Sequence, residues 1–124
     1  MSRQVSLTDL LHELTEGCGY DSALVCTDEG LLVACTGDLP TSEELAGVVG
    51  LVEDVVVRSE RDLGVQRVDE VTLLDPGRGR MVIRPLLVDG ARFHLVVRVP
   101  AKSTWRRNTN RVSRQVTRIL GGVA

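Results

Sequence analysis

The distribution of apolar residues along the chain predicts a helix, two strands, a long helix, three strands and a final helix. The first helix is expected over residues 6–16, where leucines recur with helical spacing at Leu7, Leu10, Leu11 and Leu14. Ser6 is the expected N-cap, with Asp9 three residues later in a capping-box position. Gly17 and Gly19 follow and end the helix.

Two short apolar runs, 22–27 and 31–36, follow the first helix and flank the turn Asp28-Glu29-Gly30. A glycine-containing turn between two such runs indicates a β-hairpin. Neither run alternates strongly between apolar and polar residues, which is typical of strands covered on both faces.

The long helix is predicted from Thr41 to Gly64, with Thr41 and Glu44 as a capping box. Its apolar residues cover an arc of about 160°, whereas a helix that rests on one sheet needs about 100°. The simplest cover for the excess is a second copy of the same helix, because most oligomers are two-fold dimers. The alternative is a helix sunk more deeply into its own core. In the first case Val48, Leu51 and Val55 pack between the copies.

Three further strands are predicted over 68–74, 80–87 and 92–99. The turn Asp75-Pro76-Gly77-Arg78 has the type II pattern, with Pro and Gly in the central positions. Asp89-Gly90 is a strong signal for a tight hairpin. Pro85 has no N–H to donate, so we expect it at a bulge or on the unpaired side of its strand.

The last helix begins between Ser103 and Asn108, and its two faces differ sharply. The predicted apolar face consists of Trp105, Val112, Val116, Ile119 and Val123. The opposite face carries arginines at Arg107, Arg111, Arg114 and Arg118.

Charge is distributed unevenly along the chain. Residues 1–75 hold 16 acidic residues against 4 arginines, and residues 76–124 hold 11 basic residues against one acid. Such a chain either pairs its halves internally or presents faces of opposite charge to different partners. The arginine face of the last helix could also bind nucleic acid or an anionic membrane surface. The pI of about 5.7 counts against nucleic acid, because nucleic-acid modules often exceed 9.

The residues of the chain supply no recognisable catalytic, cofactor or metal motif. Three cysteines without Cys-x-x-Cys spacing and two isolated histidines do not make a zinc site. Gly77-Arg78-Gly79 lacks the Gly-Lys-Ser/Thr of a phosphate loop and is explained by a hairpin turn. The helical carboxylates, Glu53 among them, are expected on solvated faces. We therefore expect a protein without enzymatic activity, cofactor or metal.

Length and apolar content predict one domain over residues 1–124. No apolar run approaches the roughly 18 residues of a membrane span, and the first ten residues lack the apolar region of a signal peptide. A cytoplasmic protein is expected.

The order of elements and several local patterns resemble those of the roadblock / dynein light-chain family, in particular its bacterial small-GTPase-partner type. The similarity extends from about residue 6 to 122. Its most specific part is the hairpin Asp28-Glu29-Gly30-Leu31-Leu32 with the small residues that follow. The other matching residues are Leu10-Leu11, Leu14, Ala23-Leu24-Val25, Gly37-Asp38, Glu43-Glu44-Leu45 and the two turns near the C-terminus.

This resemblance implies an α/β fold with a five-stranded antiparallel sheet of order 2-1-5-4-3 and helices on both faces. The long helix would lie on one face and the first and last helices on the other. Family members usually dimerise through their long helices and third strands, which here would add Val68, Glu70 and Thr72 to the dimer interface. Bacterial relatives look like regulators of small Ras-like GTPases.

The function expected from sequence is thus a homodimeric scaffold that binds a small GTPase and modulates its nucleotide state. The expected partner surface is the exposed side of the long helix, at Glu43, Gly47, Asp54 and Arg58. A second contact is expected on the last helix, at Arg107, Arg111 and Arg114.

Overall fold

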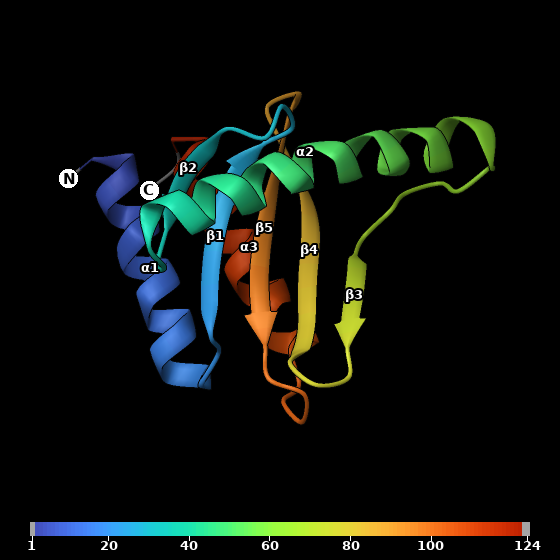
Figure 1. The fold of residues 1–124 in the computed structure, drawn as a ribbon. Helices are drawn as coiled ribbons and strands as arrows, with labels where there is room; N and C mark the ends of the chain where they lie inside the picture. The colour runs from blue at the N-terminus through green and yellow to red at the C-terminus, as the bar shows by residue number, and fades with distance from the viewer. Residues whose placement is uncertain (1, 123–124) are drawn as a thin grey trace.

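A computed structural model, which describes residues 2–122, contains one five-stranded antiparallel sheet with helices on both faces (Figure 1). The strand order is β2-β1-β5-β4-β3, as the resemblance implied. The elements are α1 (Arg3–Cys18), β1 (Ser22–Thr27), β2 (Leu32–Cys35), α2 (Leu39–Asp62), β3 (Val71–Asp75), β4 (Gly79–Val88), β5 (Ala91–Val99) and α3 (Arg106–Leu120). The predicted fold class and element order are therefore confirmed.

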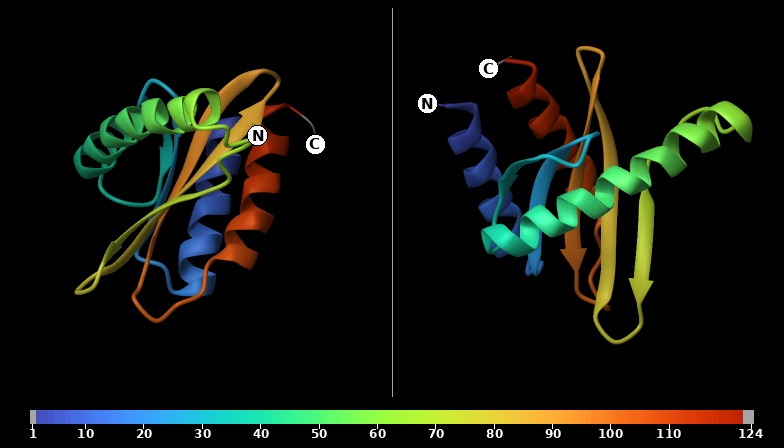
Figure 2. Two further views of the ribbon diagram at one scale, coloured as in Figure 1. Left: turned by 90° about the vertical axis from the view of Figure 1, so that its right-hand side faces the viewer. Right: turned by 45° about the horizontal axis from the view of Figure 1, so that its top comes forward.

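The sheet separates two apolar cores. Helices α1 and α3 lie side by side on one face (Figure 2), where the leucines of α1 and Val112 and Val116 of α3 pack on the strands. Helix α2 lies on the other face, with Ala46 and Val49 packed on β1, β4 and β5. Strand residues alternate between the two cores as the period of two requires.

Both of the predicted helix N-caps are wrong by a few residues. The cap of α1 is Ser2, whose hydroxyl accepts from the Val5 N–H at 3.2 Å. The cap of α2 is Asp38, whose carboxylate accepts from the Thr41 N–H at 3.0 Å. In each case an earlier side chain could reach the free N–H groups, and Pro40 fits the first turn of α2 because no intrahelical partner is needed there.

The turns and strand ends also refine the sequence expectations. Gly77 does not have the positive φ that a type II turn requires; the left-handed residue of this turn is Gly79, at φ 104°. Asp89 and Gly90 both have positive φ, as the predicted tight hairpin demands. Strand β2 lies at a sheet edge, where the implied order 2-1-5-4-3 places it, although its apolar run is typical of a strand covered on both faces.

Helix α2 approaches the β1–β2 turn so closely that glycine is required on both sides. A Cβ atom on Gly30, which has φ +86°, would lie 2.9 Å from the Ala46 carbonyl oxygen. A Cβ on Gly50 would lie 3.2 Å from the backbone of Glu29 and Gly30. This contact fixes the N-terminal half of α2 against β1 and β2, and the C-terminal half projects past β4 (Figure 1).

A chain of polar contacts ties the middle of α2 to β5. His94 is fully buried, and its Nε2 lies 2.7 Å from a carboxylate oxygen of Glu53. The other oxygen of Glu53 pairs with Arg92 at 2.9 Å, and Arg92 also contacts Glu60 at 3.3 Å. Glu60 in turn accepts from the Val68 N–H at 2.8 Å. Glu53 was expected on a solvated face and is instead mostly buried, because the helix lies close to β5 here.

Burial lowers the pKa of His94, and this effect outweighs the opposing attraction of Glu53. The geometry agrees, because Nδ1 is buried without a hydrogen-bond partner. In a neutral ring Nε2–H donates to Glu53 and Nδ1 carries only a lone pair. In a protonated ring Nδ1 would become a buried N–H donor without an acceptor, which is costly.

We expect Gly30→Ala to lower the free energy of unfolding by about 2–4 kcal/mol. Alanine would be strained at the positive φ of this position, and its Cβ would also clash with the backbone of α2. Gly90→Ala is the matched control, since Gly90 has φ +84° but open space around the Cβ position. It should cost only the strain, about 1–2 kcal/mol. Urea denaturation of both variants measures the difference, and equal losses would contradict the close approach of α2.

Stability should fall as the pH drops from 7.5 to 5.5. In the unfolded chain His94 takes up a proton near pH 6.5, whereas in the folded chain its lowered pKa resists protonation. The stability that neutral His94 contributes is therefore present above pH 6.5 and is lost as the pH falls below it. Denaturation of His94→Gln at both pH values should show a weaker pH dependence than the natural chain. His12→Gln, at an exposed site, is the control that should leave the dependence intact. An unchanged pH dependence in His94→Gln would show that His94 is not its source.

Candidate functional site

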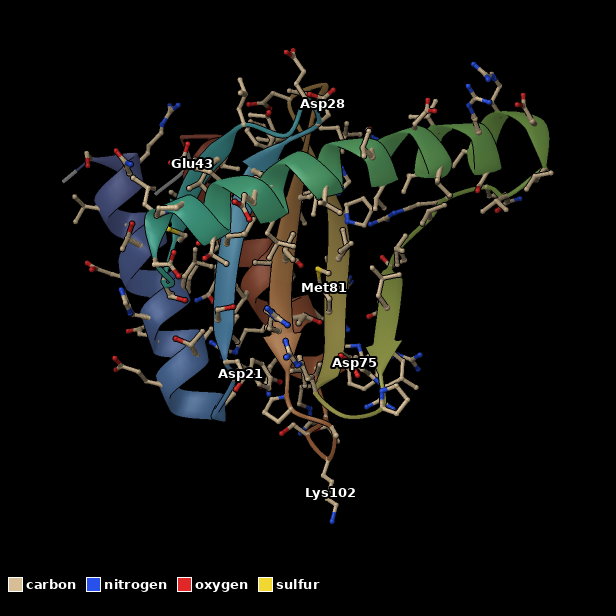
Figure 3. The ribbon with its side chains drawn as sticks, viewed as in Figure 1. Asp21, Asp28, Glu43, Asp75, Met81 and Lys102 are labelled. Atoms are coloured by element: carbon tan, nitrogen blue, oxygen red, sulfur yellow. The ribbon has the colours of Figure 1, made fainter. Side chains whose placement is uncertain are left out.

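Three exposed apolar residues lie close together along α2. Val48, Leu51 and Val55 are 47%, 74% and 60% exposed. On the helical period Val48 and Val55 lie on the flank opposite Gly50, and Leu51 lies next to them on the outer side. Because Gly50 faces the β1–β2 turn that carries Asp28, the apolar flank faces the part of the sheet that carries Met81 (Figure 3).

Strand β3 continues this apolar flank on the sheet. Val71 and Leu73 lie opposite Ile83 and Met81 in the β3–β4 register, so they share the face that carries α2. Leu73 is exposed, Val71 and Met81 are partly exposed, and Ile83 is fully buried. We call the residues Val48, Leu51, Val55, Val71, Leu73 and Met81 the α2–β3 surface. The outer edge of β3 has no neighbouring strand within residues 2–122.

The residues predicted for the dimer interface fall into two groups. Val48, Leu51 and Val55 lie together on the α2–β3 surface, as the periodicity indicated. The predicted strand 68–74 begins only at Val71, so Val68 and Glu70 lie in the connection that precedes it. The Glu70 carboxylate accepts from the Trp105 indole at 2.9 Å and from the Thr72 hydroxyl at 2.8 Å. The side chains of Glu70 and Thr72 therefore make contacts within the chain, and Glu70 is linked to Trp105 at the start of α3.

The residues predicted for partner binding on α2 lie on its outer, exposed side. Glu43, Gly47, Asp54 and Arg58 are all exposed, and they follow one another along the side that faces away from the sheet. Asp54 and Arg58 form an ion pair at 3.2 Å one helical turn apart. Leu51 separates this polar strip from the apolar flank, so the two surfaces are contiguous.

The arginine face of α3 is exposed, as predicted. Arg107, Arg111 and Arg114 point away from the buried residues Val112 and Val116. Within residues 2–122 none of these three arginines, nor Arg118, has a carboxylate within 4 Å. Val123, expected on the apolar face, lies outside the described residues. The acids of the first 75 residues that do pair with arginines, on α2, β4, β5 and the connection 63–70, are Glu53, Asp54, Glu60, Asp62 and Asp69.

A cysteine, a histidine and a carboxylate meet beneath α2. Cys26 is opposite His94 in the β1–β5 register, and His94 contacts Glu53. Burial, with a smaller effect of Glu53, raises the pKa of the Cys26 thiol to about 12. Cys26 and His94 are fully buried, so the thiol is protonated and closed to a substrate. The arrangement stabilises the fold and does not support nucleophilic catalysis.

Sequence reasoning missed this cluster because its members are separated by 27 and 41 residues and belong to three elements. His94 alternates with its strand neighbours and shares a face with Val96, but this alternation does not indicate that α2 covers that position. No group of three His, Cys, Asp or Glu side chains suited to a metal occurs in the described part of the chain. The helices found there are too short or too polar to cross a membrane.

The fold is similar to those of several solved structures. A structure of MglB with a tetrameric arrangement superimposes with a TM-score of 0.80 at 16% identity and covers 96% of this chain and 90% of that one. Myxococcus xanthus MglB gives 0.79 at 15% identity, covering 95% and 97%. A Roadblock/LC7 domain from Streptomyces avermitilis gives 0.65 at 13% identity, covering 93% and 92%.

The similarity to known proteins is found by comparing structures and not by comparing sequences. No family model matches the chain. No curated protein matches it either. At identities of 13–16% the shared property is the arrangement of the backbone, over nearly the whole length of each partner in the comparison. The chain therefore has the fold of MglB and of Roadblock/LC7 domains.

Proposed function

We propose that the protein is a non-enzymatic homodimeric scaffold that binds a small Ras-like GTPase and modulates its nucleotide state. The observation that carries the proposal is the α2–β3 surface, an apolar surface at the open edge of the sheet with a polar strip beside it. The family resemblance supplies the kind of partner, and the similarity of fold to MglB supports it.

Self-association through the α2–β3 surface would remove two unfavourable exposures at once. The exposed side chains of Val48, Leu51 and Val55 would leave water, which stabilises by roughly 25 cal/mol per Å² of apolar area. The free edge of β3 could pair with the same strand of a second copy, and an unpaired edge is otherwise prone to uncontrolled pairing. A two-fold axis allows both contacts, because each copy offers the same surface. The tetrameric arrangement of one MglB structure is consistent with self-association of this fold.

A GTPase would then bind the outer side of the paired α2 helices. That side carries both signs of charge, with Glu43 and Asp54 against Arg58, and Gly47 leaves the helix backbone open to close approach. Two α2 helices side by side would offer a broad surface on which the switch segments of a GTPase could be held in one state. Arg107, Arg111 and Arg114 would provide a second contact on the other face of the sheet.

The exposed arginine face of α3 also suits a second candidate function, the binding of nucleic acid or an anionic membrane surface. The absence of carboxylate partners for these arginines among the described residues favours some anionic ligand. The acidic pI and the polar strip on α2 keep the GTPase as the first proposal.

Leu51→Arg is expected to shift the protein from dimer toward monomer, because a charge would be buried at the centre of the contact between the two helices. Sedimentation or light scattering over a range of protein concentrations measures the shift, which should exceed tenfold in the dissociation constant. Leu31→Arg is the matched control, since Leu31 is 63% exposed but lies at the β1–β2 turn. A Leu51→Arg protein that associates as strongly as the natural chain would contradict helix pairing.

A tagged form of the natural chain should recover a Ras-like GTPase from the source lysate, with enrichment in either GDP or a non-hydrolysable GTP analogue. Gly47→Arg should lose this recovery while remaining folded, because its Cβ has open space and arginine favours a helix more than glycine does. Arg98→Glu, an exposed substitution on β5, serves as the control. Recovery of nucleic acid with no GTPase in either nucleotide state would replace the first proposal by the second.

A further inference from the structure

A groove of about 680 Å³ lies away from the α2–β3 surface, between α3, the end of β4 and the connection 63–70. The groove is not part of the surfaces described above. A groove of this size accommodates a short peptide segment or a small ligand. Three of its properties together point to the chemistry of its ligand: a free sheet edge, an unpaired buried hydroxyl and an excess of positive charge.

The floor of the groove is a stretch of β4 that has lost its neighbour. Strand β3 pairs with β4 only as far as Val71 opposite Ile83, whereas β4 continues to Val88. The floor residues Pro85, Leu86 and Leu87 therefore have β5 on one side and no strand on the other. Pro85, predicted at a bulge or on the unpaired side of its strand, lies in this stretch without a shift in the β4–β5 register, and it offers the edge no N–H. Leu87 is exposed, so the floor offers apolar contact in addition to backbone groups.

One wall of the groove is a polar flank of α3. Asn110, Ser113, Arg114 and Thr117 line it with spacings that place them on one side of the helix. Ser113 is only 8% exposed, and its hydroxyl oxygen is buried without a hydrogen-bond partner. A buried hydroxyl without a partner is uncommon in a folded protein, so Ser113 has hydrogen-bonding capacity to spare beside the groove.

The charges that line the groove are predominantly positive. Its two acids are already engaged, because Asp69 contacts Arg84 at 3.3 Å and Arg67 at 3.6 Å, and Glu60 contacts Arg92 at 3.3 Å. Arg114 lines the same groove and has no carboxylate within 4 Å in the part of the chain described. A ligand with negative charge next to Arg114 and Ser113 would satisfy both.

We propose that this groove binds an extended, acidic segment of a partner protein, which adds to the free edge of β4 in line with β3. The backbone of the segment would hydrogen-bond along β4, and a carboxylate would accept from Arg114 and from the Ser113 hydroxyl. The stretch from Arg84 to Val88 leaves room for about four or five extended residues at roughly 3.4 Å each. The sheet edge and the leucines favour a peptide over a nucleic acid, whose bases would find no aromatic ring here.

The test uses the full chain and a labelled peptide with alternating glutamate and valine, seven residues long with blocked ends, in a fluorescence anisotropy titration. Arg114→Glu is expected to weaken binding about tenfold or more. Arg107→Glu makes the same change of charge on the same helix outside the groove and should change binding less than threefold. Equal weakening by the two variants, or equal binding of a lysine–valine peptide, would overturn the proposal.

Two further measurements separate a binding role from a structural one. Ser113→Ala removes a hydroxyl that has no partner within the chain, so the melting temperature should stay the same or rise while peptide binding weakens severalfold. Two peptide isomers, N-methylated on alternate residues in one phase or the other, test edge pairing, because only one phase points its N–H groups at β4. One isomer should bind like the parent and the other should fail, and equal affinities would exclude strand addition. This inference does not depend on the GTPase, which is absent from the experiment, or on self-association, because the groove lies away from the α2–β3 surface.

Discussion

Contact between two glycine backbones determines how the rest of the molecule is arranged. Gly50 of α2 rests on Gly30 of the β1–β2 turn, and a side chain on either would hold helix and turn apart. The contact fixes the N-terminal half of a 24-residue helix over β1 and β2. A helix of this length is about 36 Å long, more than the strands beneath it can cover. Its C-terminal half therefore projects past β4, and its apolar flank stays exposed beside β3.

The position of α2 also explains the distribution of charge. Where the helix crosses β5, Glu53 and Glu60 reach Arg92 and His94, and burial gives these contacts a fixed geometry. On the opposite face Asp69 pairs with the buried Arg84, which also donates to Thr109 of α3. Glu53, Glu60 and Asp69 thus join α2 and the connection 63–70 to strands β5 and β4. Arg107, Arg111, Arg114 and Arg118 of α3, by contrast, have no carboxylate within 4 Å among residues 2–122.

The late start of β3 has a similar structural cause. Asp69 accepts from the Arg84 side chain through its backbone carbonyl at 2.9 Å as well as through its carboxylate, and the Val68 N–H donates to Glu60. Backbone groups used in this way are not available for a strand ladder. The connection between α2 and β3 therefore joins the sheet only at Val71. The end of β4 remains without a neighbouring strand on that side and forms the floor of a groove. The predicted strand 68–74 was apolar enough, but side-chain contacts to its backbone decided its true start.

Local patterns in the sequence determined the order of elements, the tight hairpin at Asp89-Gly90, the inward face of α3 and the excess apolar arc of α2. These features depend on residues close in the chain, whose spacing fixes which side chains share a face. Tertiary structure alone decided the N-caps at Ser2 and Asp38, the burial of Glu53 with His94 and the opening along β4. Each of these depends on which distant groups meet, and the free energy of a buried contact cannot be assigned before the partner is known. Where the predicted surfaces followed from periodicity, as on α2 and α3, their residues share an exposed face, and their binding roles stay predictions. The groove beside Ser113 could be found only once β3, β4 and α3 had been brought together.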